Sequence, residues 1–476
     1  MFWNTVQRFG GMIISFCSNL VLARLLTPSD YGIIGMIMVF ISLSGLLVDG
    51  GLSAALIQKK EPTSEDYSTV FYWELMLGVF FYITLFLTAP AVADFYHMPL
   101  LSTVLRVQAI ILIINAFRSI QTNQLVKQLH FRRLALFHLT ATSIGAVTGI
   151  VMAFWGFGVW SLVAKNLIDS FSLSLLLWIK STWRPLYVFS KNSFKELFSY
   201  GSLMLLSNLT DSLVFHVQSL IIGRVFSAKD LGFYTQARLL HAIPAETIPR
   251  VVNQVMFPVY SSLQDNNEKV VTAFKKSIHA LVFFNFPLML LLTVIAEPLI
   301  VFLYSDKWVE SVPYFQILCF GGMLYGLNSN NVSVIKSLGK SNYIFITTLI
   351  KRGTTLLLIF IGLQFGIFGI VIGYTISLYL YFPINAYFTG RLTGYGILKQ
   401  VRDIGPNYLL SVAVALVTLL ISDWIDVHII LLLIFQSIIF LSLYLGAAFV
   451  FGMDGYKTYL EIIYGILNKK KIYGRQ

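Results

Sequence analysis

The sequence has few charged residues and few cysteines. Only 12% of its 476 residues are Asp, Glu, Lys or Arg, whereas 57% are hydrophobic, a composition far from that of an ordinary soluble domain. The two cysteines, Cys17 and Cys319, both lie in apolar runs and suit neither a disulfide framework nor a metal site. The composition therefore predicts a membrane protein that is not held together by disulfides.

The sequence also lacks the motifs of common enzyme classes. It contains no H-E-x-x-H, G-x-S-x-G or Walker motif, the signatures of zinc proteases, α/β-hydrolases and phosphate-binding loops. His97, His216 and His279 are scattered without the spacing of metal ligands. We therefore expect no catalytic residue, no metal and no cofactor, in a protein that is not an enzyme.

Long apolar runs are present instead. A bilayer core about 30 Å thick requires roughly 20 apolar residues per helix, and such runs recur along the whole chain. The N-terminal run lacks the charged segment and cleavage site of a signal peptide, so we expect it to be retained as the first helix. The predicted fold class is an all-α polytopic membrane protein with about 14 transmembrane helices, at residues 3–25, 31–57, 68–89, 99–118, 134–154, 158–179, 198–222, 228–258, 277–303, 312–335, 342–364, 367–388, 404–422 and 427–451.

The basic residues are distributed unequally between the two sides of the membrane. Most loop Lys and Arg follow even-numbered helices or lie in the C-terminal tail, and the loops after odd-numbered helices hold only Arg24, Arg224, Lys229 and Lys307. By the positive-inside rule, both termini are expected to be cytoplasmic. The connections on the opposite side are all short, which argues against chemistry in a large outer loop.

Two short stretches of the chain repeat each other, ARLLTPSDYG at 23–32 and GRVFSAKDLG at 223–232. The shared positions are Arg24, Asp30 and Gly32 in the first and Arg224, Asp230 and Gly232 in the second. Each stretch carries a capping box, so turn chemistry alone would account for the likeness. Duplication is the alternative. It is favoured because the polar faces of the preceding helices are in phase after a shift of 200 residues, and because Gly-rich turns recur at 156–163 and 366–373.

A duplicated set of six helices returns the chain to its starting side. The two halves would therefore be parallel repeats, related by an axis along the membrane normal, as in an alternating-access transporter. The predicted domains are an N-lobe at 1–185 (helices 1–6), a C-lobe at 186–395 (helices 7–12), helices 13 and 14 at 396–455, and a basic cytoplasmic tail at 456–476.

Basic residues inside the predicted helices are the main functional signal. Exposing each to lipid would cost roughly 2.5 kcal/mol, and together they would exceed the about 5–15 kcal/mol that holds a protein folded. Most must therefore face a cavity, a partner or an interface. The predicted cavity cations that bind substrate are Arg8, Arg106, Arg238, Arg250, Lys351 and Arg352, and the predicted polar or coupling residues of the cavity are Asp211, Glu246, Lys165 and Asp169.

Simpler explanations remain open for these residues. Long basic side chains can snorkel to the nearer interface. Glu246 and Arg250 have the i, i+4 spacing of a structural ion pair, and Lys165 and Asp169 have the same spacing in reverse order. The amide-rich patch Asn328–Asn331 is explained by hydrogen bonds between helices. Two lobes around a wet, net-basic cavity would describe a carrier for an anionic or strongly polar cargo.

Four segments carry a resemblance to a known family: LARLLTPSDYG, DGGLSAALIQKKE, GFGVWSLV and DLGFYTQARLLHAIP. With them, the chain resembles the polysaccharide transporter family, the Wzx-type flippases of the multidrug/oligosaccharidyl-lipid/polysaccharide (MOP) superfamily. The likeness spans nearly the whole chain. The six motif residues named above carry over as structural signature positions only.

The resemblance implies a multi-pass protein of the bacterial inner membrane. Such a protein moves a polyprenyl-diphosphate-linked oligosaccharide from the cytoplasmic to the outer leaflet, for synthesis of O-antigen, capsule or exopolysaccharide. Its implied partners are the lipid-linked glycan and the bilayer, with polysaccharide polymerase and chain-length machinery as further candidates and no nucleic acid. Coupling to H⁺, to Na⁺ or to the membrane potential is known or proposed in relatives, and no residue of this sequence selects among them.

The charge of the cavity, the motifs and the short outer loops also bear on three rival functions. A drug or toxin antiporter of the same superfamily would favour an acidic cavity for its cationic cargo, and a peptidoglycan-precursor flippase matches the motifs less well. An O-antigen polymerase or ligase would require a large outer loop, which the sequence lacks.

Overall fold

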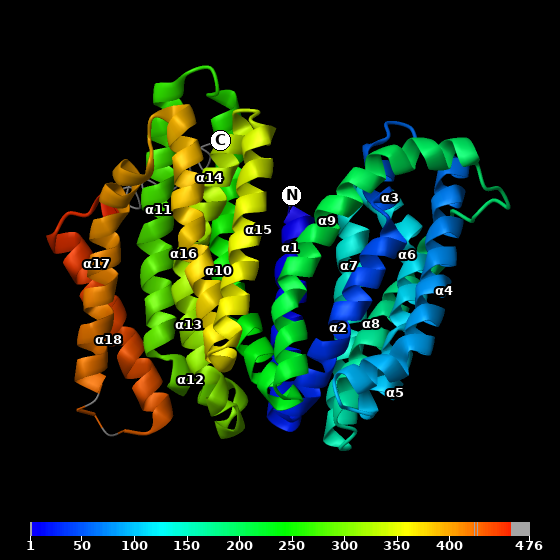
Figure 1. Cartoon of the computed structure of the whole chain (residues 1–476), viewed down its shortest axis with the longest axis horizontal. Coiled ribbons are helices and arrows are strands. Elements are labelled where there is room, and N and C mark those ends of the chain that lie inside the picture. Colours follow the sequence, from blue (N-terminus) through cyan, green and yellow to red (C-terminus); the bar gives the residue numbers. More distant parts are fainter. Residues whose placement is uncertain (1, 423, 426, 458–476) are drawn as a thin grey trace, which may run out of the picture. The chain divides into compact units, whose positions relative to one another are not determined.

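The computed structural model describes residues 2–422, 424, 425 and 427–457, and all regular structure in that part is helical (Figure 1). Within it, 12 helical segments are long and apolar enough to cross a membrane. The predicted all-α polytopic membrane fold is confirmed. Most of the predicted tail, residues 458–476, lies outside the described residues.

The chain forms two compact units that divide between Thr235 and Gln236. The helices of the first unit are α1 (Phe2–Leu25), α2 (Pro28–Asp49), α3 (Leu52–Gln58), α4 (Ser64–Phe95), α5 (Leu100–Gln108), α6 (Ile110–Lys127), α7 (Phe131–Phe154), α8 (Val159–Lys180) and α9 (Lys191–Val225). Helix α10 (Ala228–Ser262) begins in the first unit and continues in the second.

The second unit contains most of α10 and the helices that follow it. These are α11 (Asn267–Val294), α12 (Ala296–Tyr304), the 3₁₀ helix η1 (Asp306–Ser311), α13 (Val312–Met323), α14 (Tyr325–Ser337), α15 (Ser341–Leu363), α16 (Gly366–Thr393), α17 (Ile397–Ser422) and α18 (Ile429–Val450). Phe274, Phe286 and Met289 of α11 are fully buried in its core.

Two of the predicted spans are helical but differ from an ordinary membrane helix. The span at 228–258 corresponds to α10, which contains Pro244, Pro249 and Pro258 together with charged residues along its length. The span at 312–335 is divided at Leu324 into α13 and α14. Proline removes backbone hydrogen bonds within a helix and bends it. These segments therefore supply polar and irregular surface in the second unit.

The structure confirms the capping box of both repeated stretches. Asp30 accepts from the backbone N–H of Thr27 at 2.9 Å, and the Thr27 hydroxyl accepts from the Asp30 N–H. Likewise Asp230 accepts from the Ser227 N–H at 3.1 Å, and the Ser227 hydroxyl accepts in return. The boxes satisfy free N–H groups at the starts of α2 and α10.

The two motif glycines make reciprocal contacts within the first unit. A Cβ atom at Gly32 would lie 1.7 Å from the carbonyl oxygen of Ala228, and one at Gly232 would lie 1.8 Å from that of Pro28. The helix starts therefore approach each other so closely that no side chain fits at either position. Each copy of the motif packs against the other at the equivalent place.

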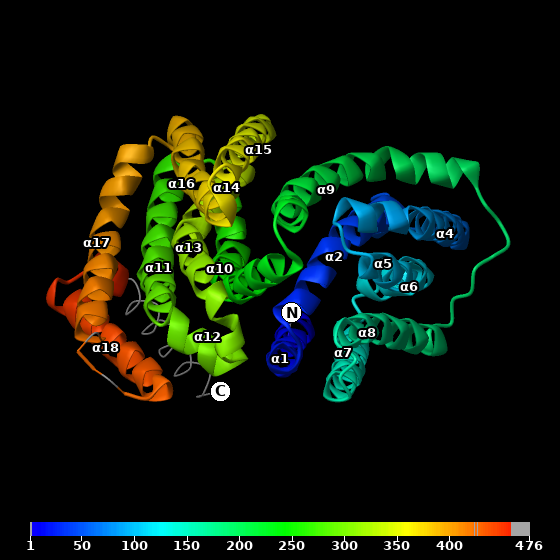
Figure 2. The same cartoon turned by 60° about the horizontal axis from the view of Figure 1, so that its bottom comes forward.

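The tightly packed helix pairs α7/α8 and α15/α16 also correspond in chain order (Figure 2). In α7, Gly145 and Gly149 face backbone oxygens of α8, and Gly362 of α15 faces the carbonyl oxygen of Gly369 in α16. Small residues let membrane helices approach closely. This shared packing is consistent with duplication, which stays a prediction.

Helix α9 packs against α2 and α3 in the first unit. The predicted C-lobe at 186–395 begins just before this helix, so the observed division after Thr235 lies later in the chain than the predicted one. Hydropathy locates a helix along the chain but does not indicate the neighbours against which it packs.

Candidate functional site

The second unit contains a cavity of about 760 Å³, which we call the unit-2 cavity. It lies among α10, α14, α15 and α16, and its charged and polar lining residues are Glu246, Arg250, Asn253, Gln254, Tyr325, Asn328, Ser329, Ser333, Lys336, Lys351, Tyr381 and Asn385. The lining therefore mixes cations, amides and hydroxyls.

Three cations and one carboxylate make the unit-2 cavity net basic. Arg250 is bound to Glu246 at 2.9 Å, which confirms the predicted i, i+4 ion pair. Lys336 comes from α14, and Lys351 of α15 holds its Nζ atom 5.5 Å from the ring centroid of Tyr381. The glutamate offsets one of the three positive charges, so a net positive field remains for an anionic ligand.

Side-chain amides connect the helices of the unit-2 cavity. Asn328 donates to the Leu378 carbonyl at 3.0 Å, and Asn385 donates to the Asn328 side chain at 3.1 Å. Asn253 of α10 donates to the Ser329 hydroxyl at 2.7 Å. The interhelical role predicted for Asn328–Asn331 is therefore confirmed at Asn328. The Oδ1 atoms of Asn253 and Asn385 have no hydrogen-bond partner among the described residues and remain as acceptors.

The first unit contains a cavity of about 750 Å³, which we call the unit-1 cavity. Helices α2, α3, α4, α6, α7 and α9 contribute to it, and its charged and polar lining residues are Ser42, Asp49, Ser53, Glu74, Asn115, Arg118, Ser119, Thr122, Asn123, His138, Asn208, Asp211 and Ser212. Three carboxylates face one guanidinium, so this lining is acidic.

Glu74 lies at the most enclosed position of the unit-1 cavity. It is 1% exposed, and its Oε2 atom has no hydrogen-bond partner among the described residues. The Ser53 hydroxyl lies 3.4 Å from Oε1, and the Asn123 amide donates to Ser53 at 2.9 Å. A buried carboxylate with so few donors is poorly solvated. The other two carboxylates of the lining, Asp49 and Asp211, would repel a phosphate rather than hold one.

The structure places four of the predicted cavity cations outside the walls of both cavities. Arg106 donates from Nε to the Phe86 carbonyl at 3.1 Å and stacks over the Phe86 ring. Arg8 is half-buried on α1, and Arg238 and Arg352 are half-buried on α10 and α15. The structure therefore brings only Arg250 and Lys351 of this set into one cavity.

The predicted polar residues divide in the same way. Asp211 lines the unit-1 cavity and Glu246 lines the unit-2 cavity. Lys165 and Asp169 lie instead where α8 packs on the glycines of α7, and Thr142 donates to Asp169 at 3.5 Å. Neither of these two belongs to the lining of a cavity described here.

The motif arginines lie outside the cavities as well. Arg24 is exposed near the end of α1. Arg224 contacts the Phe95 carbonyl oxygen, lies 2.6 Å from His97 Nε2 and stacks over the Phe95 ring. Arg224 therefore connects the end of α9 to the end of α4.

Two cavity cations are missing from the predicted site. Arg118 is the last residue of the predicted span 99–118, but α6 continues to Lys127 and carries Arg118 into the unit-1 cavity. Lys336 follows the predicted span 312–335 directly, yet it lies in α14 and lines the unit-2 cavity. When a helix continues past its apolar run, hydropathy does not indicate that the polar residues beyond the run are still helical.

Two polar cavities, in a chain whose described part has 12 helical segments of membrane-spanning length, are typical of a polytopic membrane transporter. The model of the family described as "Polysaccharide biosynthesis protein" matches residues 21–313, and the chain belongs to this family. The predicted resemblance to polysaccharide transporters is thereby confirmed.

The relatives point the same way. The chain is 26% identical to the teichuronic acid biosynthesis protein TuaB of Bacillus subtilis (strain 168), over 72% of this chain and 71% of TuaB. It is 24% identical to the succinoglycan biosynthesis transport protein ExoT of Rhizobium meliloti (strain 1021), over 74% of this chain and 72% of ExoT.

Solved structures show the shared fold. The lipid II flippase MurJ in an inward closed conformation aligns with a TM-score of 0.78 at 16% identity, over 95% of this chain and 99% of that chain. An inward-facing multidrug resistance transporter of the MATE family, within the MOP superfamily, aligns with a TM-score of 0.61 at 18% identity, over 83% of this chain and 99% of that chain.

Proposed function

We propose that this protein moves a polyprenyl-diphosphate-linked oligosaccharide from the cytoplasmic to the outer leaflet of the bacterial inner membrane, for synthesis of a surface polysaccharide. The observation that carries the proposal is the unit-2 cavity, where three cations and several amides lie among four helices. The names of TuaB and ExoT support a polysaccharide cargo, and the name of ExoT supports transport.

The cations of the unit-2 cavity can replace the hydration of a diphosphate, which hydrocarbon cannot supply. A diphosphate loses its hydration when it enters the membrane, and the cost is large unless charged donors replace the water. Arg250, Lys336 and Lys351 are charged donors from three different helices of one cavity. Charge-assisted hydrogen bonds to phosphate are roughly twice as strong as neutral ones. In this proposal the diphosphate binds these three side chains, and the polyprenyl tail stays in the lipid.

The amides provide for the glycan. Sugar hydroxyls both donate and accept, and the unit-2 cavity is lined by the amides of Asn253, Gln254, Asn328 and Asn385 and by the hydroxyls of Ser329 and Ser333. Such groups hydrogen-bond neutral sugars without requiring a charge. The cations would bind the phosphates of the headgroup, and the amides and hydroxyls would bind its first sugars.

The orientation and the energy source belong to the same proposal. Cytoplasmic termini follow from the positive-inside distribution of loop residues. Coupling to an H⁺ or Na⁺ gradient, or to the membrane potential, stays a prediction. Among the described residues, the carboxylates of the unit-1 cavity are the candidates for this coupling.

A superfamily drug or toxin antiporter is the second candidate, because the unit-1 cavity is acidic and would suit a cationic cargo. The two candidates make opposite demands on the cavities. A flippase depends on the cations of the unit-2 cavity, and an antiporter depends on the carboxylates of the unit-1 cavity.

Deletion and complementation of the gene test the function directly. We expect the deletion to leave the lipid-linked glycan on the cytoplasmic side and to deplete it from the outer leaflet, with both pools measured by leaflet-selective labelling. Complementation with the intact chain should restore the outer pool. Unpolymerised glycan that still reaches the outer leaflet would contradict the proposal, and so would an unchanged glycan with a new sensitivity to cationic drugs.

A further inference from the structure

The connector between α8 and α9 exposes a short run of apolar side chains. Residues 181–190 are not helical, and Leu186, Tyr187, Val188 and Phe189 are all exposed, with Tyr187 100% exposed. These residues lie outside every helix of membrane-spanning length. Contiguous exposed apolar side chains outside a span mark a surface that another molecule covers.

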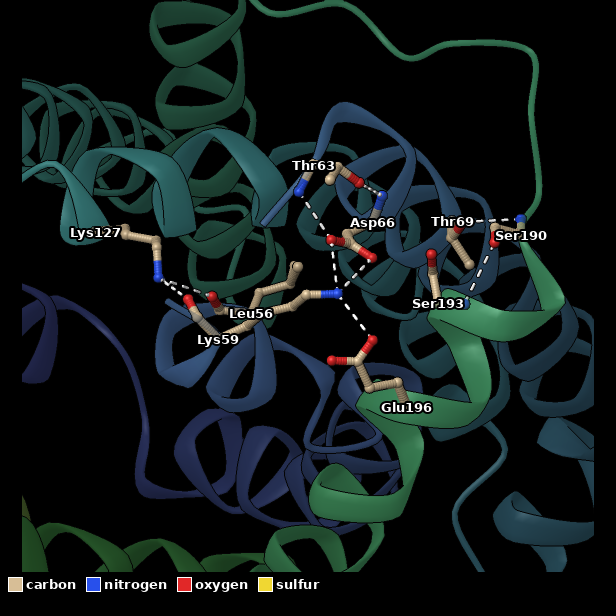
Figure 3. A network of polar contacts seen from close by, with 9 residues as sticks. All are labelled: Leu56, Lys59, Thr63, Asp66, Thr69, Lys127, Ser190, Ser193 and Glu196. Atoms are coloured by element: carbon tan, nitrogen blue, oxygen red, sulfur yellow. Dashed lines mark hydrogen bonds and ion pairs between the residues drawn. The ribbon is translucent and has the colours of Figure 1, made fainter. Parts of the chain in front are cut away.

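Hydrogen bonds to α4 fix the backbone of this connector. The N–H of Leu186 donates to the Ser68 hydroxyl at 2.9 Å. The N–H of Ser190 donates to the Thr69 hydroxyl at 3.0 Å, as Figure 3 shows. Ser68 and Thr69 are fully buried at the start of α4. The exposed side chains are therefore presented by an anchored backbone.

The start of α9 is fixed by a second set of polar contacts. Ser190 caps α9 by accepting from the Ser193 N–H, and Glu196 of α9 pairs with Lys59 at 2.9 Å (Figure 3). Lys59 also pairs with Asp66 of α4 at 3.0 Å. Burial lowers the pKa of Lys59, but hydrogen bonds and negative charge from Glu196 and Asp66 outweigh this effect, so the pKa lies above its ordinary value. Lys59 therefore stays charged and ties α9 to α4.

Chain order predicts that the connector lies at the level of the membrane surface. It joins the end of α8, at Lys180, to the start of α9, at Lys191, and both helices are of membrane-spanning length. Helix α9 has 35 residues, which corresponds to about 50 Å at 1.5 Å per residue and exceeds the about 30 Å of the hydrocarbon core. Its first turns therefore have room to lie among the lipid headgroups.

Cations flank the apolar run on both sides. Lys180, Arg184, Lys191 and Lys195 are all exposed, and no Asp or Glu occurs between Asp169 and Glu196. None of the four forms an ion pair with a carboxylate in the described part of the chain. Arg184 folds back over the Trp178 ring and donates to the Ser181 carbonyl at 2.8 Å. Within residues 180–195, every charged side chain is therefore positive, and the apolar run lies among them.

We propose that residues 180–195 form an interfacial anchor that binds anionic phospholipids of the leaflet predicted to be cytoplasmic. The side chains of 186–189 enter the boundary between headgroups and acyl chains, and the four cations bind lipid phosphates. Apolar insertion flanked by Lys and Arg is the chemistry with which a segment lies on an anionic membrane. This anchor is independent of the cargo.

A fluorophore placed on the connector tests the anchor in the intact protein. The probe is attached at Tyr187→Cys in a Cys17→Ser background, because the remaining Cys319 is fully buried. Asp265→Cys, in the exposed loop between α10 and α11, is the matched control on the same predicted side. The protein is placed in nanodiscs of phosphatidylcholine with or without phosphatidylglycerol, and quenching by lipids brominated in the acyl chain is compared with quenching by aqueous iodide.

We expect bromolipid quenching roughly threefold stronger at position 187 than at 265, and stronger still with phosphatidylglycerol. A triple variant with Arg184→Gln, Lys191→Gln and Lys195→Gln should show no increase of bromolipid quenching with phosphatidylglycerol. The charge-preserving triple variant, Arg184→Lys, Lys191→Arg and Lys195→Arg, should still show this increase. Equal iodide quenching at the two positions would overturn the proposal. If the probe at position 187 were protected from iodide only in native membranes, the surface would bind another protein. If it were protected only with added polyprenyl diphosphate, the surface would take part in substrate entry. Either result would overturn the lipid anchor.

Discussion

The two cavities have nearly the same volume, about 750 Å³ in the first unit and about 760 Å³ in the second, but opposite charge. The unit-1 cavity holds Asp49, Glu74 and Asp211 with Arg118, whereas the unit-2 cavity holds Glu246 with three cations. An anion is repelled by the first lining and attracted by the second, so a diphosphate has one favourable place among the two.

This difference changes how the overall charge is to be understood. The chain has a formal net charge of +12, and much of it lies in loops, where it orients the helices in the membrane. In the proposed function, the charge that binds the cargo comes from a few side chains of the unit-2 cavity. If the predicted N-lobe and C-lobe descend from a duplicated set of helices, the charge around their cavities has diverged while the motif turns and the close helix pairs stayed alike.

The largest expected effect comes from removing the positive charge of the unit-2 cavity. Lys336→Gln combined with Lys351→Gln should lower transport at least about tenfold, because a hydrogen bond to a charged group contributes roughly 1.5–3 kcal/mol. The measurement is the amount of lipid-linked glycan in the outer leaflet per folded protein. Lys340→Gln, in an exposed loop, and Arg106→Gln, outside both cavity linings, are the controls. Full activity of the double variant would mean that the charge difference is unrelated to the cargo.

The next effect concerns the motif that the two halves share. Gly32→Ala and Gly232→Ala should each lower the yield of folded protein several-fold, because the new Cβ would overlap a backbone carbonyl and overpacking costs roughly 1–3 kcal/mol. The yield is measured as monodisperse protein after extraction. Gly11→Ala is the control, since nothing lies within 4 Å of a Cβ there. If one of the two variants were well tolerated, the reciprocal contact would not be equivalent in the two copies.

A smaller effect is expected from making the unit-2 cavity more basic. Glu246→Gln removes the carboxylate that pairs with Arg250, and we expect the apparent affinity for the lipid-linked glycan to rise about two- to fivefold. Stability should change little, because exposed i, i+4 pairs contribute about 0.3–0.5 kcal/mol. Uptake into proteoliposomes at graded substrate concentrations provides the measurement. A fall in affinity at unchanged stability would show that Glu246 itself contacts the substrate.

The smallest effect is expected in the unit-1 cavity. Asp49→Asn keeps the acceptor for the Gly51 N–H at 3.0 Å and removes one negative charge. The affinity for the glycan should change by less than about twofold, because the charge does not act at the proposed phosphate site. The same proteoliposome assay measures it. A loss as large as that of the lysine variants would place the anionic headgroup, or a step that it depends on, in the first unit.

Local chemistry explains which features could be predicted from the sequence. The capping boxes at Thr27 and Ser227 and the Glu246–Arg250 pair each lie within one turn of the chain, and the structure confirms all three. The helical membrane fold follows from apolar runs, each of which is also local.

Features that depend on tertiary packing could not be predicted in this way. Arg106 has no acidic neighbour in sequence, and its partner is a backbone carbonyl of another helix, to which any residue type could contribute. Lys336, Lys351 and Asn385 meet in one cavity although they come from three helices. Helix α9 was assigned by chain order to the predicted C-lobe, and its packing on α2 and α3 leaves no mark in its hydropathy.

The position of the headgroup can be measured by photocrosslinking from inside each cavity. A benzophenone amino acid replaces Val332 in the unit-2 cavity or Leu46 in the unit-1 cavity, two half-buried lining residues, and the proteoliposomes receive radiolabelled polyprenyl-diphosphate-linked glycan. We expect label on the protein from position 332 and little from position 46. Label from position 46 alone would contradict the account.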